Sequence, residues 1–326
     1  PARDPSRVRQ RGQLPGHLVS ALLLDVVGID DAVPGIRTLR LARPDRAPLP
    51  SFTPGSHLVV EYDGGANAYS LTGETSAPQE YTVSVLNRVD GRGGSRWIHG
   101  LSVGDTVAAR GPRSAFAPVL RARRHLLIAA GIGITPMVSH LRSARRWGRD
   151  ARLLYIHRPG RGAYVDEIRA LTDQARFFTD RAAFLAELAA ALPDSPFGTH
   201  AYVCGPGVFI DDVVALATGF GWPASRIHVE HFGGELAPGE PFEVELTHSG
   251  ESFVVESGVS LLEALEAHGH AVPNMCRQGV CGQCRLPVRS GVVLHRDLYL
   301  TQAERDAGDA MMACVSRARG RLGLSL

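Results

Sequence analysis

The feature that most restricts the fold of this chain is a group of four cysteines toward its end. Cys276, Cys281 and Cys284 are spaced as Cys-x4-Cys-x2-Cys, and Cys314 follows after 29 intervening residues. Grouped cysteines in a long chain indicate metal or redox chemistry, whereas the disulfide framework of a small secreted domain spreads its cysteines more evenly. Because Cys314 comes from a distant segment, the four thiols can meet only after the domain around them has folded.

The spacing of these cysteines matches the plant-type pattern that holds a [2Fe–2S] cluster. The loop over residues 277–283 contains two glycines, which let the backbone wrap tightly and direct N–H groups toward sulfur. A Zn(Cys)4 site is the alternative, but zinc sites usually join two close cysteine pairs, and here the last ligand is single. The predicted iron ligands are Cys276, Cys281, Cys284 and Cys314.

The size and charge of the chain restrict its class. Its 326 residues suggest two or three domains. The 35 basic and 33 acidic residues leave a formal net charge of +2, which gives no broad electrostatic case for nucleic acid or an anionic membrane. No apolar run approaches the roughly 18 to 20 residues that span a bilayer, and the polar start lacks a signal-peptide core. We therefore expect a cytoplasmic protein that binds neither nucleic acid nor membrane, with residues 1–17 as an N-terminal arm.

Short strands separated by turns are typical of residues 18–120. Leu58–Tyr62 and Tyr81–Val85 alternate and are rich in β-branched side chains, so each predicts a strand. Glycine-rich turns such as Asp90–Gly94 separate such segments. Several strands at close spacing with few helices predict a small antiparallel barrel or sandwich.

The pattern changes to strand and then helix over residues 121–232. His125–Ala130 is a continuous apolar run, as expected of a strand buried on both faces of a parallel sheet, and it leads into a helical stretch over 137–147. Further elements are expected at 152–156, 184–192 and 199–204. This alternation predicts a doubly wound α/β domain.

A stretch rich in glycine and proline, residues 233–241, is the candidate linker to a third unit, residues 242–326. The third unit is expected to contain strands at 242–247 and 252–256 and a helix at 260–268. The cysteine group completes it.

Two further motifs accompany the cysteine loop, Leu294-His-Arg-Asp297 and Cys314-Val-Ser-Arg-Ala318. Together with Cys276–Cys284 they resemble the ferredoxin domain of the phthalate dioxygenase reductase family. The resemblance implies a multidomain fold with an antiparallel flavin-binding β-barrel, a doubly wound α/β nicotinamide domain and an α+β ferredoxin-like β-grasp domain. It also implies that hydride passes from NADH to a flavin, and that single electrons then leave through the [2Fe–2S] cluster.

The resemblance implies a terminal oxygenase as partner, of a Rieske-type oxygenase or demethylase system, and we expect the reductase itself to be a monomer. A reductase for a haem monooxygenase shares every motif and differs only in its acceptor. An alternative of another class is a redox-sensing iron–sulfur module that does not turn over. Rapid bleaching of a bound flavin and cluster by NADH would exclude that module.

A glycine turn followed by a helix is the candidate site for the dinucleotide. Gly131-Ile-Gly133 lies between a buried strand and a helix, where glycine lets the backbone approach a pyrophosphate and the helix start offers N–H groups. Thr135 and Pro136 follow directly. The motif is not the full G-x-G-x-x-G fingerprint, because Pro136 replaces the third glycine.

The resemblance also identifies residues at the nicotinamide and ribose ends of this site. It places Cys204-Gly205-Pro206 beside the nicotinamide ring, with Cys204 as a catalytic residue. It places Arg158 near the adenosine ribose. The family favours NADH, but Arg158 and Arg161 together could accept a 2′-phosphate, so NADPH is the alternative.

Residues 67–72, Asn-Ala-Tyr-Ser-Leu-Thr, resemble the family's flavin motif. The resemblance places the catalytic Ser70 hydroxyl near the reactive N5 of the flavin, where a donor would stabilise the reduced anionic form. Asn67 departs from the family, which has an arginine there that reaches the flavin phosphate. Binding of the phosphate could be weaker, or Arg88, Arg92 or Arg113 could compensate. The flavin-binding residues of this segment are Asn67, Tyr69, Ser70, Leu71 and Thr72.

Other segments would complete the flavin site. A glycine-rich turn resembles the family's phosphate-binding turn and offers backbone N–H groups, a charge and a hydroxyl. Its residues are Arg92, Gly93, Gly94 and Ser95. Val83 and Val85 would supply backbone groups to the polar edge of the flavin, and Phe232 stands where the family places an aromatic ring. The family favours FMN over FAD, a choice that the residues themselves do not decide.

Overall fold

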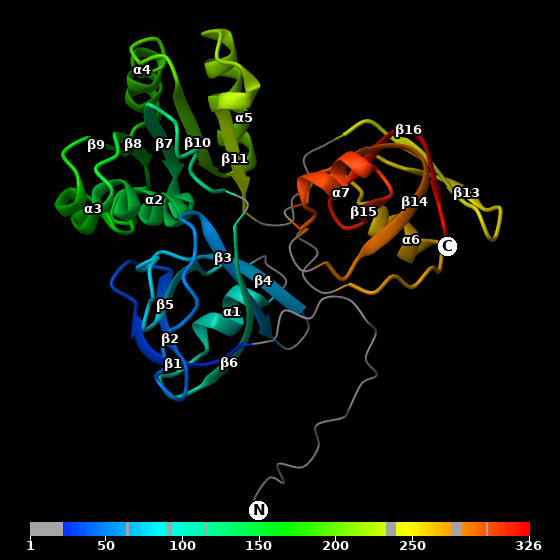
Figure 1. Cartoon of the computed structure of the whole chain (residues 1–326), viewed down its shortest axis with the longest axis horizontal. Coiled ribbons are helices and arrows are strands. Elements are labelled where there is room, and N and C mark those ends of the chain that lie inside the picture. The colour runs from blue at the N-terminus through cyan, green and yellow to red at the C-terminus, as the bar shows by residue number, and fades with distance from the viewer. Residues whose placement is uncertain are drawn as a thin grey trace, which may run out of the picture.

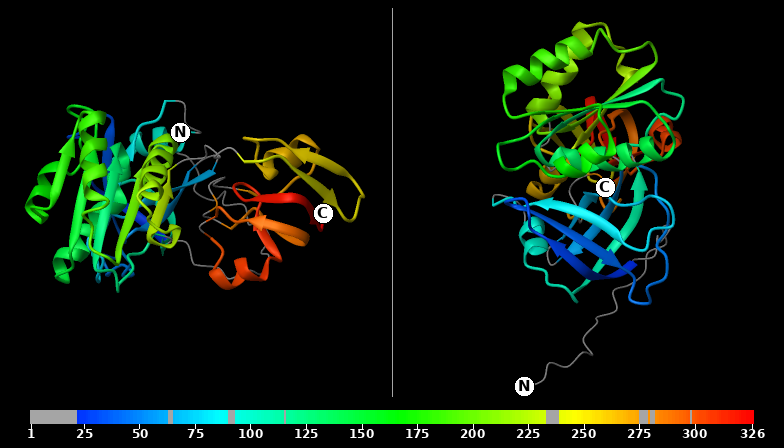
Figure 2. Two further views of the ribbon diagram at one scale, coloured as in Figure 1. Left: turned by 90° about the horizontal axis from the view of Figure 1, so that it is seen from above. Right: turned by 90° about the vertical axis from the view of Figure 1, so that its left-hand side faces the viewer.

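The computed structural model describes residues 22–326 apart from 63–64, 90–92, 115, 233–238, 275–278, 280–281 and 298. The described residues form three units, each built on one sheet (Figure 1). In Figure 2 the yellow-to-red third unit lies to one side of the blue and green units. The expected N-terminal arm and most of the expected linker lie outside the described residues.

The first unit is a six-stranded antiparallel sheet in the order β4-β3-β6-β1-β2-β5. An isolated bridge between Leu71 and Val83 joins the two edges of the sheet, so that it curls into a barrel. Alternating apolar side chains such as Leu39, Leu58 and Val107 fill its interior. Its elements are β1 (Leu22–Asp30), β2 (Ile36–Ala42), β3 (Ser56–Tyr62), β4 (Gly65–Ser70), β5 (Tyr81–Leu86), α1 (Gly94–His99) and β6 (Thr106–Ser114).

The second unit is a five-stranded parallel sheet in the order β11-β10-β7-β8-β9. The buried side chains of its central strand alternate between two cores. Leu127 lies in the core with α2, and Leu126 and Ile128 lie in the core with α4 and α5. Its elements are β7 (Arg124–Ala130), η1 (Gly131–Gly133), α2 (Ile134–Arg146), β8 (Ala151–Ile156), α3 (Val165–Leu171), β9 (Ala175–Phe178), α4 (Arg181–Ala191), β10 (Thr199–Gly205), α5 (Gly207–Gly219), η2 (Ala224–Arg226) and β11 (Ile227–His231). This is the predicted doubly wound domain.

The third unit is a mixed five-stranded sheet in the order β13-β12-β16-β14-β15, in which β12 and β16 run parallel. Helix α6 packs Leu261, Leu262 and Leu265 into its core, and a capping box formed by Ser260 and Glu263 begins that helix. Its elements are β12 (Phe242–Leu246), β13 (Ser252–Val255), α6 (Leu261–Ala267), β14 (Arg285–Leu294), α7 (Gln302–Ala307), β15 (Ala310–Met312) and β16 (Arg317–Leu324). A helix packed on such a sheet is the expected β-grasp arrangement.

The predicted strands and helices are found with small shifts. The helix expected from 137 begins at Ile134, because Pro136 is tolerated in a first helical turn, where no N–H is needed. The helix expected from 184 begins at Arg181, because the Asp180 side chain accepts the N–H of Ala183 and caps it earlier. Within the described part of the chain, no helix is long and apolar enough to cross a membrane.

Candidate functional site

Two of the four predicted iron ligands are described, and both are buried. Cys284 directly precedes β14 and Cys314 follows β15, and their exposed fractions are 2% and 3%. The N–H of Ala313 donates to the carbonyl of Cys284 at 3.0 Å, which draws the two cysteine backbones together. Cys276 and Cys281 lie outside the described residues, so the complete ligand set stays a prediction.

The described glycines of the cysteine loop are packed tightly against the segment that follows β14. Gly279 and Gly282 have φ angles of 72° and 80°, a conformation that other residues rarely adopt. A Cβ at Gly279 would press on the backbone of Asp297, and one at Gly282 would overlap the ring of Tyr299. A tight loop beside two buried thiols fits a [2Fe–2S] cluster, whose sulfurs need backbone N–H groups close by.

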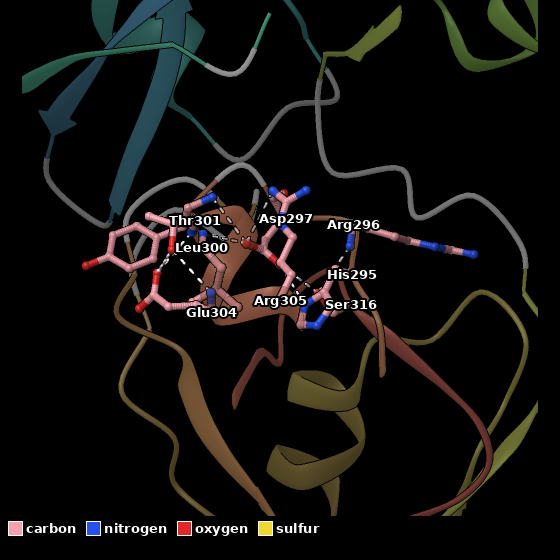
Figure 3. A network of polar contacts seen from close by, with 9 residues as sticks. His295, Arg296, Asp297, Leu300, Thr301, Glu304, Arg305 and Ser316 are labelled. Carbon is pink, nitrogen blue, oxygen red and sulfur yellow. Dashed lines mark hydrogen bonds and ion pairs between the residues drawn. The ribbon is translucent and has the colours of Figure 1, made fainter. Parts of the chain in front are cut away.

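Asp297 is the centre of the polar network beside this loop (Figure 3). Its buried carboxylate accepts the backbone N–H groups of Tyr299 at 3.2 Å and Leu300 at 2.8 Å, and the hydroxyl of Ser316 at 3.2 Å. Arg305 donates to its backbone carbonyl at 2.6 Å. Asp297 therefore ties the turn that covers the cysteine loop to the segment after the last cysteine.

The two predicted nicotinamide motifs meet at the carboxyl edge of the parallel sheet. Gly133 of η1 lies so close to the end of β10 that a Cβ there would overlap the carbonyl oxygen of Cys204. Gly131 begins the same turn, and Thr135 and Pro136 form the first turn of α2. Ligands bind at this edge in open α/β sheets, so the geometry fits a dinucleotide whose pyrophosphate faces the start of α2.

Cys204 is fully buried at the end of β10. Burial raises the pKa of its thiol well above the usual range, and Glu230 adds to the shift once it is ionised. A protonated thiol is a poor nucleophile, so the side chain can shape the site but cannot attack a substrate near neutral pH. Gly205 packs on Phe209, and Pro206 directly precedes α5.

Glu230 is a buried acid at this edge that the motif analysis missed. It is the neighbour of Cys204 across the β10–β11 pair, and one of its carboxylate oxygens has no hydrogen-bond partner among the described residues. Burial raises its pKa to about 8, so the side chain is largely protonated at neutral pH. The only sequence signal was an ionisable residue within a strand at the end of the α/β unit. Phe232 lies just after this strand and packs on the core beneath α2.

Arg158 lies on the loop after β8, at the same carboxyl edge and two strands away from Cys204. It is exposed, and its backbone carbonyl accepts the N–H of Arg161 at 3.0 Å. Both arginines therefore lie on one turn at the edge where an adenosine ribose would end.

The predicted flavin motif lies along β4 and the residues after it. Ser70 is 4% exposed, and its Oγ has no hydrogen-bond partner in the described part of the chain. A buried hydroxyl without a partner is costly unless a ligand completes it, so Ser70 fits the predicted flavin contact. Leu71 bridges to Val83 of β5, and Val85 lies further along the same buried strand. These segments therefore lie side by side, as the flavin prediction requires.

Asn67 lies against the predicted phosphate turn. Its side-chain nitrogen is so close to Gly94 that a Cβ there would overlap it. The same nitrogen donates to the Tyr69 hydroxyl at 3.2 Å, and burial of Tyr69 raises the pKa of that phenol to about 12. Gly93 precedes α1, and the Ser95 hydroxyl accepts the N–H of Arg88 at 3.1 Å. Asn67 thus occupies space between β4 and the turn, while Arg92 lies outside the described residues.

A contact that the sequence did not predict joins the flavin motif to the α/β unit. The Tyr164 hydroxyl donates to Oγ1 of Thr72 at 3.0 Å and lies 2.5 Å from Oγ of Ser84. Oγ of Ser84 lies 2.6 Å from Oγ1 of Thr38. Tyr164 has a φ of 62°, an unusual value for a residue with a side chain. The phenol therefore reaches from the start of α3 into the barrel within two residues of Ser70.

Comparisons with protein families identify two regions. Residues 105–227 match the family "Dimethylamine monooxygenase subunit DmmA-like, N-terminal domain". Residues 244–319 match "2Fe-2S iron-sulfur cluster binding domain". The second match contains all four predicted iron ligands.

Individual proteins match over most of the chain. A haem-dependent oxidative N-demethylase beta subunit from Ectopseudomonas mendocina is 41% identical over 83% of this chain and 88% of its own length. Phthalate dioxygenase reductase from Burkholderia cepacia is 35% identical over 91% and 95%. The solved structure of a phthalate dioxygenase reductase, described as modular for electron transfer from pyridine nucleotides to [2Fe–2S], has a TM-score of 0.67 at 34% identity and covers 94% of this chain and 98% of its own.

Proposed function

The chain belongs to the phthalate dioxygenase reductase family, and we propose that it oxidises NADH with a bound FMN and supplies single electrons to a terminal oxygenase. It is an oxidoreductase of the kind that combines a flavin, a pyridine nucleotide and a [2Fe–2S] cluster. A flavin supplies the step between two-electron and one-electron chemistry, because it accepts hydride and releases electrons singly.

One observation supports this proposal most directly. The α/β unit touches the barrel at the flavin motif, through the hydrogen bond from Tyr164 to Thr72. Because η1, which contains Gly133, also lies against β5 of the barrel, a nicotinamide held at the edge of Gly133 and Cys204 would lie beside a flavin held by Ser70. Hydride transfer needs the two rings in close and fixed contact, so the adjacency of the two sites is the property that the reaction requires.

Each group of site residues would have a distinct role in this reaction. Ser70 would donate its hydroxyl hydrogen to the flavin. The absence of a Cβ at Gly133 lets η1 pack against the end of β10, and this contact would hold the start of α2 in place for the pyrophosphate. The protonated Glu230 would keep net negative charge away from the incoming nicotinamide. The cysteine thiolates would hold the cluster in the third unit.

A spectrum of the purified protein with cofactor extraction tests the proposal. We expect flavin and iron–sulfur absorbance, anaerobic bleaching of both by NADH, and FMN in the extract. A kcat/KM for NADPH well above that for NADH would overturn the nucleotide assignment. Absence of either chromophore after reconstitution would overturn the function.

For the partner we propose a Rieske-type oxygenase or demethylase component. A haem-dependent demethylase is the second candidate, because the relative from Ectopseudomonas mendocina carries that name. Reconstitution with each class of purified oxygenase separates them, since only the true partner will couple NADH consumption to oxidation of its substrate.

A further inference from the structure

A cation–π contact joins the barrel to the ferredoxin unit. The guanidinium carbon of Arg113, near the end of β6, lies 4.6 Å from the centroid of the Tyr299 ring in the turn after β14. Both side chains are half-buried. A guanidinium over an aromatic face is attracted by the ring electrons, and shielding from water strengthens the attraction.

On the ferredoxin side, Tyr299 touches the loop that carries the predicted iron ligands. Its ring lies directly on Gly282, which stands between Cys281 and Cys284 in the sequence and leaves room for the ring because it lacks a Cβ. The carboxylate of Asp297 accepts the backbone N–H of Tyr299 at 3.2 Å. The buried Asp297 therefore fixes the backbone of Tyr299, and the ring of Tyr299 lies between the cysteine loop and Arg113.

On the barrel side, Arg113 belongs to a row of residues that leads to the flavin motif. It is the register partner of His57 in β3, and His57 is the register partner of Ser70 in β4. His57 is 2% exposed, and neither of its ring nitrogens has a hydrogen-bond partner among the described residues. Burial and the charge of Arg113 lower its pKa to about 4, so this histidine is neutral and Arg113 carries the charge of the row.

We propose that Arg113 and Tyr299 are positioning residues that dock the cysteine loop of the ferredoxin unit against the barrel, at the end of the cross-strand series Arg113, His57 and Ser70. Their contact thereby sets the rate of electron transfer from flavin to cluster. This inference rests on the proposed function. Each transfer oxidises the reduced flavin by one electron and reduces one ferric ion of the cluster to the ferrous state, and no bond to either residue forms or breaks.

The test compares four variants of the full-length, reconstituted protein: Tyr299→Leu, Tyr299→Phe, Arg113→Gln and the double variant Arg113→Gln with Tyr299→Leu. Stopped-flow absorbance follows flavin reduction by NADH and then cluster reduction. We expect Tyr299→Leu and Arg113→Gln each to slow cluster reduction by about tenfold, the order of effect of one shielded cation–π contact on the docked population. Tyr299→Phe keeps the ring and should stay within about twofold of the native rate.

Two results would show that the two residues act through one another. The double variant should be no slower than the slower single variant, because the second change removes a contact that is already lost. Hydrogen exchange should also rise in the peptide of β6 when only Tyr299 is changed, which a local role in the ferredoxin unit would not produce. Arg110→Gln, which removes an arginine from the same strand, is the matched control and should leave cluster reduction unchanged.

Other outcomes overturn the proposal. Rate losses that multiply in the double variant, or cluster reduction unchanged in both single variants, contradict docking by this pair. Loss of flavin from Arg113→Gln would assign that arginine to the flavin phosphate instead. Loss of iron from Tyr299→Leu would assign the ring to the cysteine loop alone, and Arg113→Gln then decides whether docking exists. Failure of NADH to reduce the cluster of the native protein would refute the proposed function, whatever the variants do.

Discussion

The barrel contacts its two neighbours in different ways. Toward the α/β unit, hydrogen bonds cross the boundary at separate points: the Gly55 N–H donates to Oγ of Ser139 at 2.9 Å, and Tyr164 bonds to Thr72 at 3.0 Å. Arg142 adds an ion pair to Glu74 at 3.4 Å. Toward the ferredoxin unit, the contact described above is the Arg113–Tyr299 pair.

The difference corresponds to two kinds of chemistry. Hydride transfer proceeds only when donor and acceptor atoms are nearly in contact, and a displacement of about 1 Å can cost 100-fold in rate. A boundary held at several separate points resists such displacement. An electron can pass between centres that are not in contact, so the boundary with the ferredoxin unit does not need the same precision. Among the described residues, the Arg113–Tyr299 pair contributes to that boundary.

The largest expected effect is the complete loss of electron transfer through the ferredoxin unit. Cys314→Ser removes a predicted iron ligand from a buried site, so the protein should lose its cluster and its delivery of electrons to the oxygenase. Iron and acid-labile sulfide content, with the visible spectrum, measure this loss. A variant that retained a full cluster would refute the ligand assignment.

The next largest effect should be on flavin reduction by NADH, without any effect on the ferredoxin unit. In Gly133→Ala the new Cβ would overlap the carbonyl oxygen of Cys204, so the turn must move away from β10. We expect flavin reduction by NADH to slow by about 100-fold. Electron exchange between a chemically reduced flavin and the cluster should be unaffected. Gly207→Ala, where a Cβ meets open space, is the matched control.

The pH dependence of stability should report on Glu230. Its folded-state pKa of about 8 lies above the ordinary carboxyl value of 4.5, so the folded protein holds a proton that the unfolded chain releases. The free energy of unfolding must therefore fall as the pH rises through this window and level off above about 8. Glu230→Gln removes that loss and should be more stable than the native protein at pH 9, by an amount on the order of a few kcal/mol.

Urea unfolding at pH 5, 7 and 9 measures the difference. The exposed Glu243→Gln serves as the control and should show the same pH profile as the native protein. Parallel profiles for the native protein and Glu230→Gln would mean that folding does not raise the pKa of Glu230.

The smallest expected effect comes from one hydrogen bond at the boundary between the barrel and the α/β unit. Tyr164→Phe removes one hydroxyl, but Ser84 keeps its contact with Thr38 and Thr72 keeps its bond to the Thr82 carbonyl. We expect a loss of about 1 kcal/mol in stability and a fall of a few-fold in hydride transfer. Cluster reduction from the reduced flavin should not change. An equal loss in both steps would contradict the separation of the two boundaries.

Sequence reasoning predicted those contacts of the candidate site that depend on local chemistry. Gly133 and Cys204 could be placed because a glycine after a buried strand, and a motif at a strand end, lie at the same edge of any parallel sheet. The iron ligands were predicted from the spacing of the cysteines, and their assignment stays a prediction. The fold of the first two units followed from periodicity, because alternating and continuous apolar runs distinguish a barrel from a doubly wound sheet. The β-grasp fold of the third unit was implied by the family resemblance.

Two of the missed residues make contacts between units. Tyr164 and Tyr299 have no sequence context that indicates their partners, because Thr72 and Arg113 lie far away in the chain and belong to other units. Glu230 differs from most other acidic residues through its burial, which raises its pKa and which the sequence alone does not show. Short elements such as α1 and α3 were also missed, because six or seven residues carry too little periodicity to be read from a pattern.

The strand order of the α/β unit has a practical meaning for cofactor engineering. Strand β7 separates β10, which ends at the predicted nicotinamide site, from β8, which leads into the loop of Arg158 and Arg161. Two steps across a sheet span about 10 Å. A library confined to that exposed loop can therefore be screened for a changed preference between NADH and NADPH without altering the residues around Cys204. Evolution could change the nucleotide choice by the same route and leave the reacting end as it is.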